Sequence, residues 1–550
     1  MNNLMHHELV DQLQGLTVGQ ALRRSASTYP NHAFFKTANE SVNFGDFDLK
    51  IDHLACALLS LGIRRGDHVA VWLGNSLEWA SCFFACARIG AVVIPINTRY
   101  TANEAAYIIK QSDSKVLVMT GSLFKIDFPE MLKSMAPKIV SQQPGEIRLN
   151  DFPSLQHIIG VETEGTPYAH DFSQLLRTPI DRLTLDQAEK SVHWDDVLII
   201  CYTSGTTGHP KGVMHNHGVI KQATRVGLAL DLKAGDRLLG HMPLYHVAGL
   251  YMGLVPAMTL GACFINMPHW DSSQALDLME REHITTFGGI PTHFVDLVND
   301  PSLPGRNLSN IRNAWIGGAP VMRSTFERFK KLLGIHQLMS TYGMTENTIS
   351  TTFNRLDDPI ERCCLNQAPI LGPTEISLID PNTGEACAPG EVGEVWCRGE
   401  TVMLGYYKNP QATHETITPE GWLRTGDLGC MDRDGYLSIT GRLKEMFKSG
   451  GTNVYPAEIE QHLVKHESIK LVAVVGVPDE RLSEVGFAFV ECHDGQNVTL
   501  AELRAFCKGA LASYKVPKYL KIVPAIPRTS TGKIQKGALT ELAKKELKLS

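Results

Sequence analysis

The sequence lacks the cysteine spacing of a metal site and the long apolar run of a membrane span. Its 12 cysteines include no Cys-x-x-Cys pair, and residues 1–7 carry no secretory signal, so a reduced, cytoplasmic protein is expected. The longest apolar run, Gly249–Ile265, contains Pro256 and has no basic flanks. It is short for a span and predicts a buried helix and strand beside a ligand pocket, with no transmembrane segment. Peripheral contact with a membrane needs no such run and stays open.

An excess of positive charge is also missing. The 550 residues include 52 lysines and arginines against 58 acidic residues, which gives a net charge of −6. This balance argues against a nucleic-acid-binding protein. With 43% hydrophobic and 20% charged residues, the composition is that of a soluble globular protein, and the length calls for two or more domains.

Short apolar runs alternate with helical stretches, which predicts an α/β fold with mostly parallel sheets. The runs are Val69–Trp72, Ala91–Ile96, Val116–Met119, Phe287–Ile290 and Ala314–Ile316. Residues 138–175 are more polar and are predicted to form a variable connection. A last strand-like run ends at Thr440. After it, a compact α+β pattern begins, with a helix at 458–466, strands at 471–475 and 487–490, and a capping box from Thr499 to Glu502.

A Walker A motif is absent, since no Gly is followed by four residues and Gly-Lys-Ser/Thr. A different glycine-rich segment, TSGTTGHPKGV at 203–213, follows the strand-like run Val197–Tyr202. Its glycines can turn amide N–H groups toward an anion, and its hydroxyls and lysine add donors for phosphate oxygens. A plain surface turn is the alternative for so short a stretch. The predicted phosphate ligands are Thr203, Ser204, Gly205, Thr206, Thr207, Gly208 and Lys211.

Five segments in this order resemble the motifs of the acyl-adenylate-forming superfamily, which includes acyl-CoA synthetases, peptide-synthetase adenylation domains and beetle luciferases. Besides the phosphate loop they are Ser340–Glu346 (STYGMTE), Gly421–Asp427 (GWLRTGD), Gly441–Lys444 (GRLK) and Arg528–Lys533 (RTSTGK). The resemblance implies a large N-terminal domain, residues 1–440, of mostly parallel sheets with flanking helices. It also implies a hinge at 441–446 and a small mobile α+β lid at 447–550.

The resemblance implies an ATP-dependent acyl-CoA ligase, in which ATP and a carboxylic acid form an acyl adenylate with release of pyrophosphate, and coenzyme A then converts the adenylate to acyl-CoA with release of AMP. The resemblance implies that Lys533 is catalytic and bridges the carboxylate and the α-phosphate, while Thr345 contacts the α-phosphate. Glu346 is the implied Mg²⁺ ligand, since magnesium prefers hard oxygen donors. An exposed tail lysine and an exposed glutamate are the plainer alternatives for Lys533 and Glu346.

The implied motion turns the small domain about Lys444. It brings Lys448 toward the acyl group in place of Lys533, and two glycines, Gly450 and Gly451, leave room for the thiol of coenzyme A. A simple turn at these glycines is the alternative.

The remaining implied nucleotide ligands follow the other motifs. Asp427 should accept hydrogen bonds from the ribose hydroxyls, although it also suits a plain Gly-Asp turn. Tyr342 offers its ring to adenine, and Arg442 lies near the ribose. The full set is Gly318, Ala319, Pro320, Thr341, Tyr342, Gly343, Met344, Asp427 and Arg442. From Lys508 onward, ten lysines and arginines face two glutamates, which fits either a solvated face or attraction of the phosphates of ATP or coenzyme A.

The acyl pocket is the least defined part of the sequence. Its predicted residues are His246, Val247, Tyr251, Trp315 and Gly317, each of which also suits ordinary core packing. Between Pro243 and Leu254 there is no aspartate to pair with an α-ammonium group, so a medium-chain, branched or aromatic acid is favoured over an amino acid. The partners expected are the acid, ATP and coenzyme A, with a homodimer also considered. The main alternative is a ligase that delivers its acyl group to a carrier-protein thiol.

Overall fold

The computed structural model describes residues 8–203, 210–318, 321, 323–364, 367–450, 452–528 and 534–548. The chain has a mixed α/β fold with a large N-terminal part and a small C-terminal part. Two compact units are formed, the first by Met1–Glu375 with Arg398–Leu423 and the second by Ile376–Cys397 with Arg424–Ser550. The second unit thus takes in stretches that precede the predicted hinge. The hinge at 441–446 concerns a motion, and it stays a prediction.

The first unit contains two eight-stranded sheets, which we name sheet A and sheet B. Sheet A has the strand order β17-β16-β15-β14-β12-β13-β1-β2, and sheet B has the order β21-β11-β10-β4-β3-β5-β8-β9. The strands of sheet A are β1 (Ala33–Lys36), β2 (Ser41–Asn43), β12 (Arg237–Gly240), β13 (Cys263–Asn266), β14 (Thr286–Gly289), β15 (Asn313–Gly317), β16 (Gln337–Tyr342) and β17 (Thr352–Phe353). Those of sheet B are β3 (His68–Trp72), β4 (Val92–Pro95), β5 (Val116–Thr120), β8 (His157–Val161), β9 (His170–Asp171), β10 (Val197–Thr203), β11 (Lys211–Asn216) and β21 (Gly405–Tyr406).

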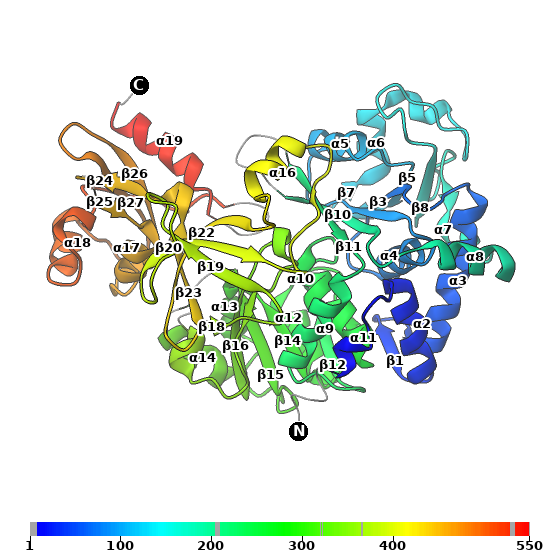
Figure 1. Cartoon of the computed structure of the whole chain (residues 1–550), viewed down its shortest axis with the longest axis horizontal. Helices are drawn as coiled ribbons and strands as arrows, with labels where there is room; N and C mark the ends of the chain where they lie inside the picture. Colours follow the sequence, from blue (N-terminus) through cyan, green and yellow to red (C-terminus); the bar gives the residue numbers. More distant parts are fainter. Residues whose placement is uncertain are drawn as a thin grey trace. The chain divides into compact units, whose positions relative to one another are not determined.

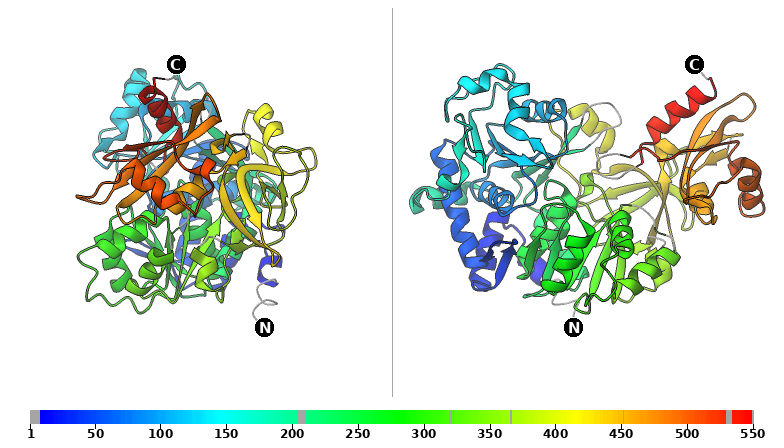
Figure 2. Two further views of the ribbon diagram at one scale, coloured as in Figure 1. Left: turned by 90° about the vertical axis from the view of Figure 1, so that its left-hand side faces the viewer. Right: turned by 180° about the vertical axis from the view of Figure 1, so that it is seen from behind.

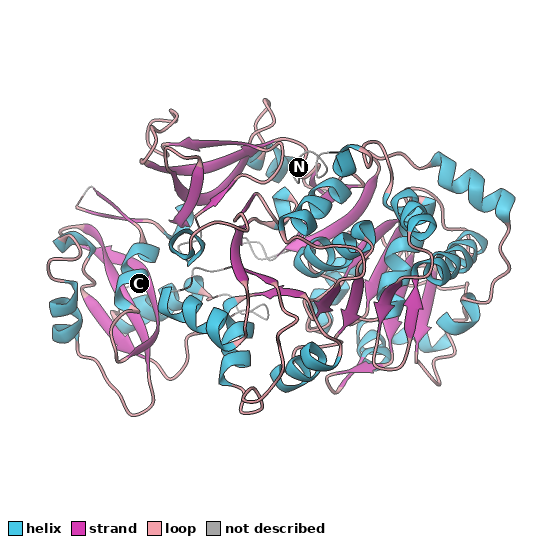
Figure 3. Ribbon diagram, turned by 90° about the horizontal axis from the view of Figure 1, so that it is seen from below, coloured by secondary structure: helices cyan, strands magenta, loops and turns pink. Residues whose placement is uncertain are grey.

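Helices cover the faces of both sheets (Figures 1 and 3). Their bounds are α2 (Val18–Thr28), α3 (Phe44–Ser60), α4 (Leu77–Ile89), α5 (Ala102–Gln111), α6 (Phe128–Met135), α8 (Arg182–Ser191), α9 (Val219–Ala229), α10 (Val247–Gly249), η2 (Leu250–Leu254), α11 (Val255–Leu260), α12 (Ser272–Arg281), α13 (Pro291–Asn299), α14 (Arg323–Leu332), α15 (Ile360–Cys364) and α16 (Pro410–Thr416). None of the helices in the described ranges is both long and apolar enough to cross a membrane.

Strands buried on both faces explain why the sequence shows continuous apolar runs rather than alternation. In β3, Val69 and Val71 belong to a core that also contains α2, α3 and α4, whereas Ala70 and Trp72 belong to another core with α5 and α6. The first of these cores includes Phe264 of sheet A, so it lies between the two sheets. A third core lies under α12, α13 and α14 on the other side of sheet A. The layers are therefore helix, sheet, helix, sheet, helix.

The predicted alternation of strands and helices is confirmed, but residues 138–175 are not only a connection. His157–Val161 forms β8, which pairs in parallel with β5. Ile158 and Ile159 in this strand are completely buried. The run is only five residues long and its neighbours are polar, so the polarity of the wider segment hid it.

In its described residues, the second unit contains two smaller sheets and the α-helices α17, α18 and α19. Figure 2 shows its elements from two further sides. One sheet includes β23, β22, β20 and β19 in that order, and the other has β25-β24-β27-β26 with β28 beside β27. The bounds are β19 (Glu375–Ile379), β20 (Val392–Arg398), β22 (Leu423–Met431), β23 (Tyr436–Arg442), η4 (Leu443–Glu445), β24 (Phe447–Ser449), β25 (Thr452–Val454), α17 (Pro456–Leu463), β26 (Ile469–Asp479), β27 (Ser483–Cys492), α18 (Leu500–Cys507), β28 (Tyr519–Ile522) and α19 (Lys536–Glu546).

The predicted elements of this unit are largely confirmed. Helix α17 overlaps the predicted helix but begins and ends earlier, and strands β26 and β27 contain the predicted strands and extend beyond them at both ends. The Thr499–Glu502 capping box opens α18. Strand β23 continues to Arg442, two residues beyond the predicted end at Thr440. This extension matters for the site, because it brings Arg442 into the sheet.

Candidate active site

Among the described residues, most of the nucleotide ligands predicted in the first unit lie at the carboxyl end of a parallel strand or just after it. Strands β14, β15 and β16 run parallel in sheet A and end at Gly289, Gly317 and Tyr342. In sheet B, β10 runs parallel to β4 and ends at Thr203. Ligands of open α/β sheets bind at such ends, because the loops that follow the strands meet there.

The loop after β16 is built around a close backbone contact at Gly343. A Cβ atom at this position would lie 1.6 Å from the carbonyl oxygen of Ile349, so a side chain does not fit. Thr348 and Ile349 have φ values of 59° and 72°, which are unusual for residues that are not glycine. Strain of this kind is often found at functional sites, where the surrounding structure maintains it. The loop thus folds back on itself just after Glu346.

Glu346, the predicted metal ligand, is held by a residue outside the sequence motifs. Its Oε1 accepts a hydrogen bond of 3.0 Å from the hydroxyl of Tyr406, and the residue is only 9% exposed. The Lys211 ammonium lies over the same Tyr406 ring, 4.9 Å from its centroid. Tyr406 stands in β21, which pairs with β11, and no motif marks it in the sequence. Tyr406 therefore contacts both Lys211 of the phosphate loop, through its ring, and Glu346 of a distant motif, through its hydroxyl.

A buried histidine fixes the neighbouring residue, Thr345. The carbonyl of Thr345 lies 2.8 Å from Nε2 of His215, which stands in β11 and is 2% exposed. Burial lowers the pKa of His215 to about 4, so the ring is neutral near pH 7. Its Nε2–H then donates to the Thr345 carbonyl. His215 carries no sequence signal either, because a single histidine in a strand is usually a packing residue.

Two predicted nucleotide ligands of the second unit are neighbours in its sheet. Asp427 of β22 and Arg442 of β23 face each other in register, and Arg442 Nε lies 3.3 Å from Asp427 Oδ1. The Asp427 side chain is 10% exposed, whereas that of Arg442 is 57% exposed. The guanidinium can therefore reach a ligand while it orients the carboxylate.

The hinge and the second predicted catalytic lysine also lie in this unit. Lys444 is in the short turn η4, and Lys448 is exposed in β24, where its backbone N–H donates to Glu484. Gly450 has a φ of 58° and donates its N–H to the carbonyl of Leu482. This left-handed backbone conformation suits glycine. The role of Gly450 in thiol access stays a prediction.

Several predicted residues lie outside the described part of the chain. They are Ser204, Gly205, Thr206, Thr207 and Gly208 of the phosphate loop, Ala319, Pro320, Gly451 and Lys533. Their assigned roles stay predictions.

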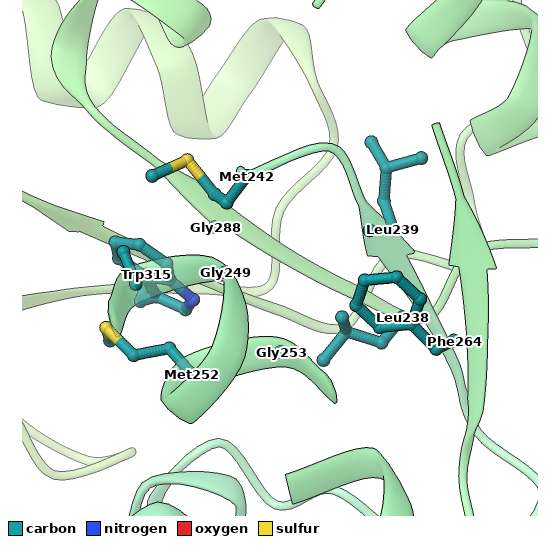
Figure 4. Close-up of a pocket in the computed structure, with 11 residues that line it drawn as sticks. Leu238, Leu239, Met242, Gly249, Met252, Gly253, Phe264, Gly288 and Trp315 are labelled. Carbon is teal, nitrogen blue, oxygen red and sulfur yellow. The ribbon is translucent and has the colours of Figure 1, made fainter. Parts of the chain in front are cut away.

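A small cavity lies against sheet A and the helical segment α10–η2, part of which is a π-helical turn (Figure 4). Its volume is about 10 Å³, roughly the space of one water molecule. The indole of Trp315 lies across Gly288, where an added Cβ would come within 2.0 Å of its ring nitrogen. The lining residues are Leu238, Leu239, Gly240, Met242, Ala248, Gly249, Met252, Gly253, Phe264, Gly288 and Trp315.

Of the five predicted acyl-pocket residues, Trp315 lines this cavity. His246 accepts a hydrogen bond from the N–H of Ala248 at 3.1 Å and so caps α10. Val247 and Tyr251 are buried, and the Tyr251 ring lies edge-on to His215. Gly317 pairs with Thr341 in the next strand. A place for all five residues in the acyl pocket stays a prediction.

This fold, with its nucleotide motifs, is that of an adenylate-forming enzyme. The family model described as AMP-binding enzyme matches residues 22–407, and the one described as AMP-binding enzyme C-terminal domain matches residues 458–533. The chain belongs to the AMP-binding enzyme family, whose members use ATP.

Curated relatives and solved structures agree with this assignment. The chain is 36% identical over 534 residues to "Putative acyl-CoA synthetase YngI" of Bacillus subtilis (strain 168), covering 96% of each protein. It is 32% identical over 547 residues to the mitochondrial medium-chain acyl-CoA ligase ACSF2 of Mus musculus, covering 98% of this chain and 89% of the relative. Its fold resembles the crystal structure of the anthranilate CoA ligase AuaEII with anthranoyl-AMP, at a TM-score of 0.83 and 26% identity, covering 97% and 98% of the two chains.

Proposed function

We propose that the protein is an ATP-dependent acyl-CoA ligase that works through an acyl-AMP intermediate. The observation that carries this proposal is the cluster of Lys211, Tyr406 and Glu346. It brings a cation for phosphate oxygens and a carboxylate for a metal to the ends of strands that also bear the nucleotide motifs. The family membership and the acyl-CoA ligase relatives support the same reaction.

In the first step, a carboxylate oxygen of the acid attacks the α-phosphorus of ATP, the bond to the β-phosphate oxygen breaks, and pyrophosphate leaves. Two anions must meet, so charge neutralisation and positioning are the main tasks of the protein. Lys533 bridges the carboxylate and the α-phosphate, while Thr345 contacts the α-phosphate. Asp427 and Arg442 hold the ribose.

The residues present fit a magnesium ion. Glu346 offers a hard carboxylate oxygen, and the Tyr406 hydroxyl orients it, as outer partners of metal ligands commonly do. Mg²⁺ supplies charge neutralisation to the phosphates when it is bound. Among the described residues no group of three or more histidine, cysteine or acidic side chains is placed to enclose a metal, in keeping with an ion that takes its other ligands from ATP and water.

In the second step, the thiol of coenzyme A attacks the carbonyl carbon of the acyl adenylate, loses its proton and displaces AMP. Lys533 and the thiol need the same space, so the small domain turns about Lys444 between the steps. Lys448 and the glycines Gly450 and Gly451 then face the acyl group. Replacing Lys444 by proline fixes φ near −65° and should slow thioester formation while sparing adenylation.

The acid that we propose is of medium chain length, branched or aromatic. The cavity beside Trp315 is narrow, yet Met242 and Met252 line it, and methionine side chains adapt readily to a ligand. The names of the relatives fit this range, since one acts on medium-chain acids and another on anthranilate. A homodimer and a cytoplasmic location remain predictions.

The test is acid-dependent pyrophosphate release with a panel of short, medium, long and aromatic acids, followed by mass spectrometry of the products. Coenzyme A should give a thioester with at least one acid of the proposed range. If adenylates form but acyl-CoA does not, the carrier-protein alternative takes over. Exchange of pyrophosphate driven mainly by amino acids would overturn the proposed substrate class.

A further inference from the structure

Three charged side chains of the second unit, Lys536, Glu445 and Glu460, form a largely buried cluster. Lys536 Nζ lies 2.7 Å from Glu445 Oε2 and 2.8 Å from Glu460 Oε1. The Lys536 side chain is only 15% exposed. In such a cluster each charge depends on the others, because removing one partner leaves the rest uncompensated in a poorly hydrated place.

The position of Lys536 in its helix is unusual for a lysine. It is the first residue of α19, where the helix dipole disfavours a cation. Gln535 in front of it makes no side-chain capping bond. Burial lowers the pKa of Lys536, but Glu460 and Glu445 together raise it above its ordinary value, so the ammonium stays charged. The two carboxylates, rather than the helix, stabilise a charged lysine at this position, and their bonds to Lys536 anchor the start of α19.

The two acidic residues tie this helix start to other elements. Glu445 is the last residue of η4 and directly follows Lys444, the proposed hinge. Glu460 lies in α17, and its Oε1 also accepts the N–H of Val474 in β26 at 2.7 Å. The cluster therefore connects the start of α19 with the hinge turn and with the core of the second unit.

The chain just before α19 is anchored as well. Ile534 forms an isolated antiparallel bridge with Arg528, and the N–H of Gln535 donates to the carbonyl of Pro527 at 2.9 Å. Lys533 directly precedes Ile534 and stands three residues before Lys536, which is about 10 Å of chain at most. Whatever holds Lys536 in place thus holds the point at which Lys533 is attached.

We propose that Lys536 is a positioning residue for adenylation: its bonds to Glu445 and Glu460 fix the attachment point of Lys533 relative to the hinge turn at Lys444. This inference rests on the proposed function, in which Lys533 serves the first step and not the second. Loss of the cluster should therefore impair adenylate formation far more than thioester formation.

The experiment is a double-mutant cycle in the full-length protein. Four forms are compared: the unchanged chain, Lys536→Met, Lys533→Ala and the double variant. Acid-dependent pyrophosphate release measures the first step, and acyl-CoA formation from supplied acyl-AMP measures the second. Lys544→Met is the matched control, because Lys544 lies in the same helix and pairs with Glu541 at the surface. Lys536→Arg and Glu445→Gln, with melting temperatures for all variants, separate positioning from loss of fold.

Lys536→Met should slow the first step by about a hundredfold, the cost of a misplacement of about 1 Å, and change the second by less than about threefold. In the Lys533→Ala background it should add almost nothing, since residues that act as a unit are not additive. Lys536→Arg should restore most of the rate, and Glu445→Gln should impair the first step selectively. The proposal is overturned if the rate losses of Lys536→Met and Lys533→Ala multiply in the double variant, or if Lys536→Met slows both steps equally. A normal first step in Lys533→Ala overturns instead the proposed role of Lys533, and this inference falls with it.

Discussion

Replacing Tyr406 by phenylalanine should weaken the dependence of the enzyme on Mg²⁺ without unfolding it. The substitution removes one oxygen, the hydroxyl that donates to Glu346 Oε1 at 3.0 Å. The ring stays, so the Lys211 ammonium keeps its contact with the aromatic face. The carboxylate loses a partner that orients it, while its position in the loop is unchanged.

The size of the effect follows from the kind of bond that is lost. A hydrogen bond to a charged group contributes about 1.5–3 kcal/mol. Since about 1.4 kcal/mol corresponds to a factor of ten, the apparent affinity for Mg²⁺ should fall about 10- to 100-fold, the range seen for outer partners of metal ligands.

The assay is acid-dependent pyrophosphate release at saturating ATP over a wide range of Mg²⁺ concentrations. The chain offers a matched control in the next residue, because the hydroxyl of Tyr407 donates to Asp113 Oδ2 at 2.9 Å, away from Glu346. Tyr407→Phe should leave the Mg²⁺ dependence unchanged. If Tyr406→Phe, like the Tyr407→Phe control, has the Mg²⁺ dependence and the melting temperature of the unchanged chain, Glu346 is not the metal ligand that we propose.

Three further outcomes are expected. Stability to urea should fall as the pH drops from about 6.5 toward 4, because burial lowers the pKa of His215 and His217 from 6.5 to about 4 in the folded protein. Unfolding therefore takes up protons in this window, which lowers the free energy of unfolding by about 2 kcal/mol per histidine at pH 5. A free energy of unfolding that does not change over this pH range contradicts the prediction. Trp315→Ala should shift the preferred acids toward longer chains and lower the melting temperature, whereas an unchanged preference in the acid panel separates Trp315 from the acyl pocket. Asp427→Ala should raise the Michaelis constant for ATP with little change in that for the acid, and an effect confined to the acid places Asp427 elsewhere.

Much of the fold can be predicted from the sequence, because strands buried on both faces leave unmistakable apolar runs. Strands β3, β5 and β10 are marked in this way. Strand β8 is the exception, since five residues between polar segments give too little signal. The extension of β23 to Arg442 is likewise decided by pairing with β22 rather than by local composition.

Only the motif residues of the candidate site can be predicted from the sequence. Glu346 and Thr345 stand in a recognisable motif, and their nature suits the chemistry. The residues that hold them, Tyr406 and His215, come from other parts of the chain and act through single hydrogen bonds. Nothing in the local sequence distinguishes them from packing residues, so only the three-dimensional arrangement identifies them.

The most direct test of the acyl-adenylate route follows the oxygen atoms of the acid. A carboxylic acid labelled with ¹⁸O at both carboxyl oxygens is incubated with the enzyme, ATP, Mg²⁺ and coenzyme A, and the products are examined by mass spectrometry. Attack of the carboxylate on the α-phosphorus predicts one ¹⁸O in AMP, one in the acyl-CoA carbonyl and none in pyrophosphate. Label in a released phosphate with formation of ADP, or AMP free of label, would contradict the acyl-adenylate route.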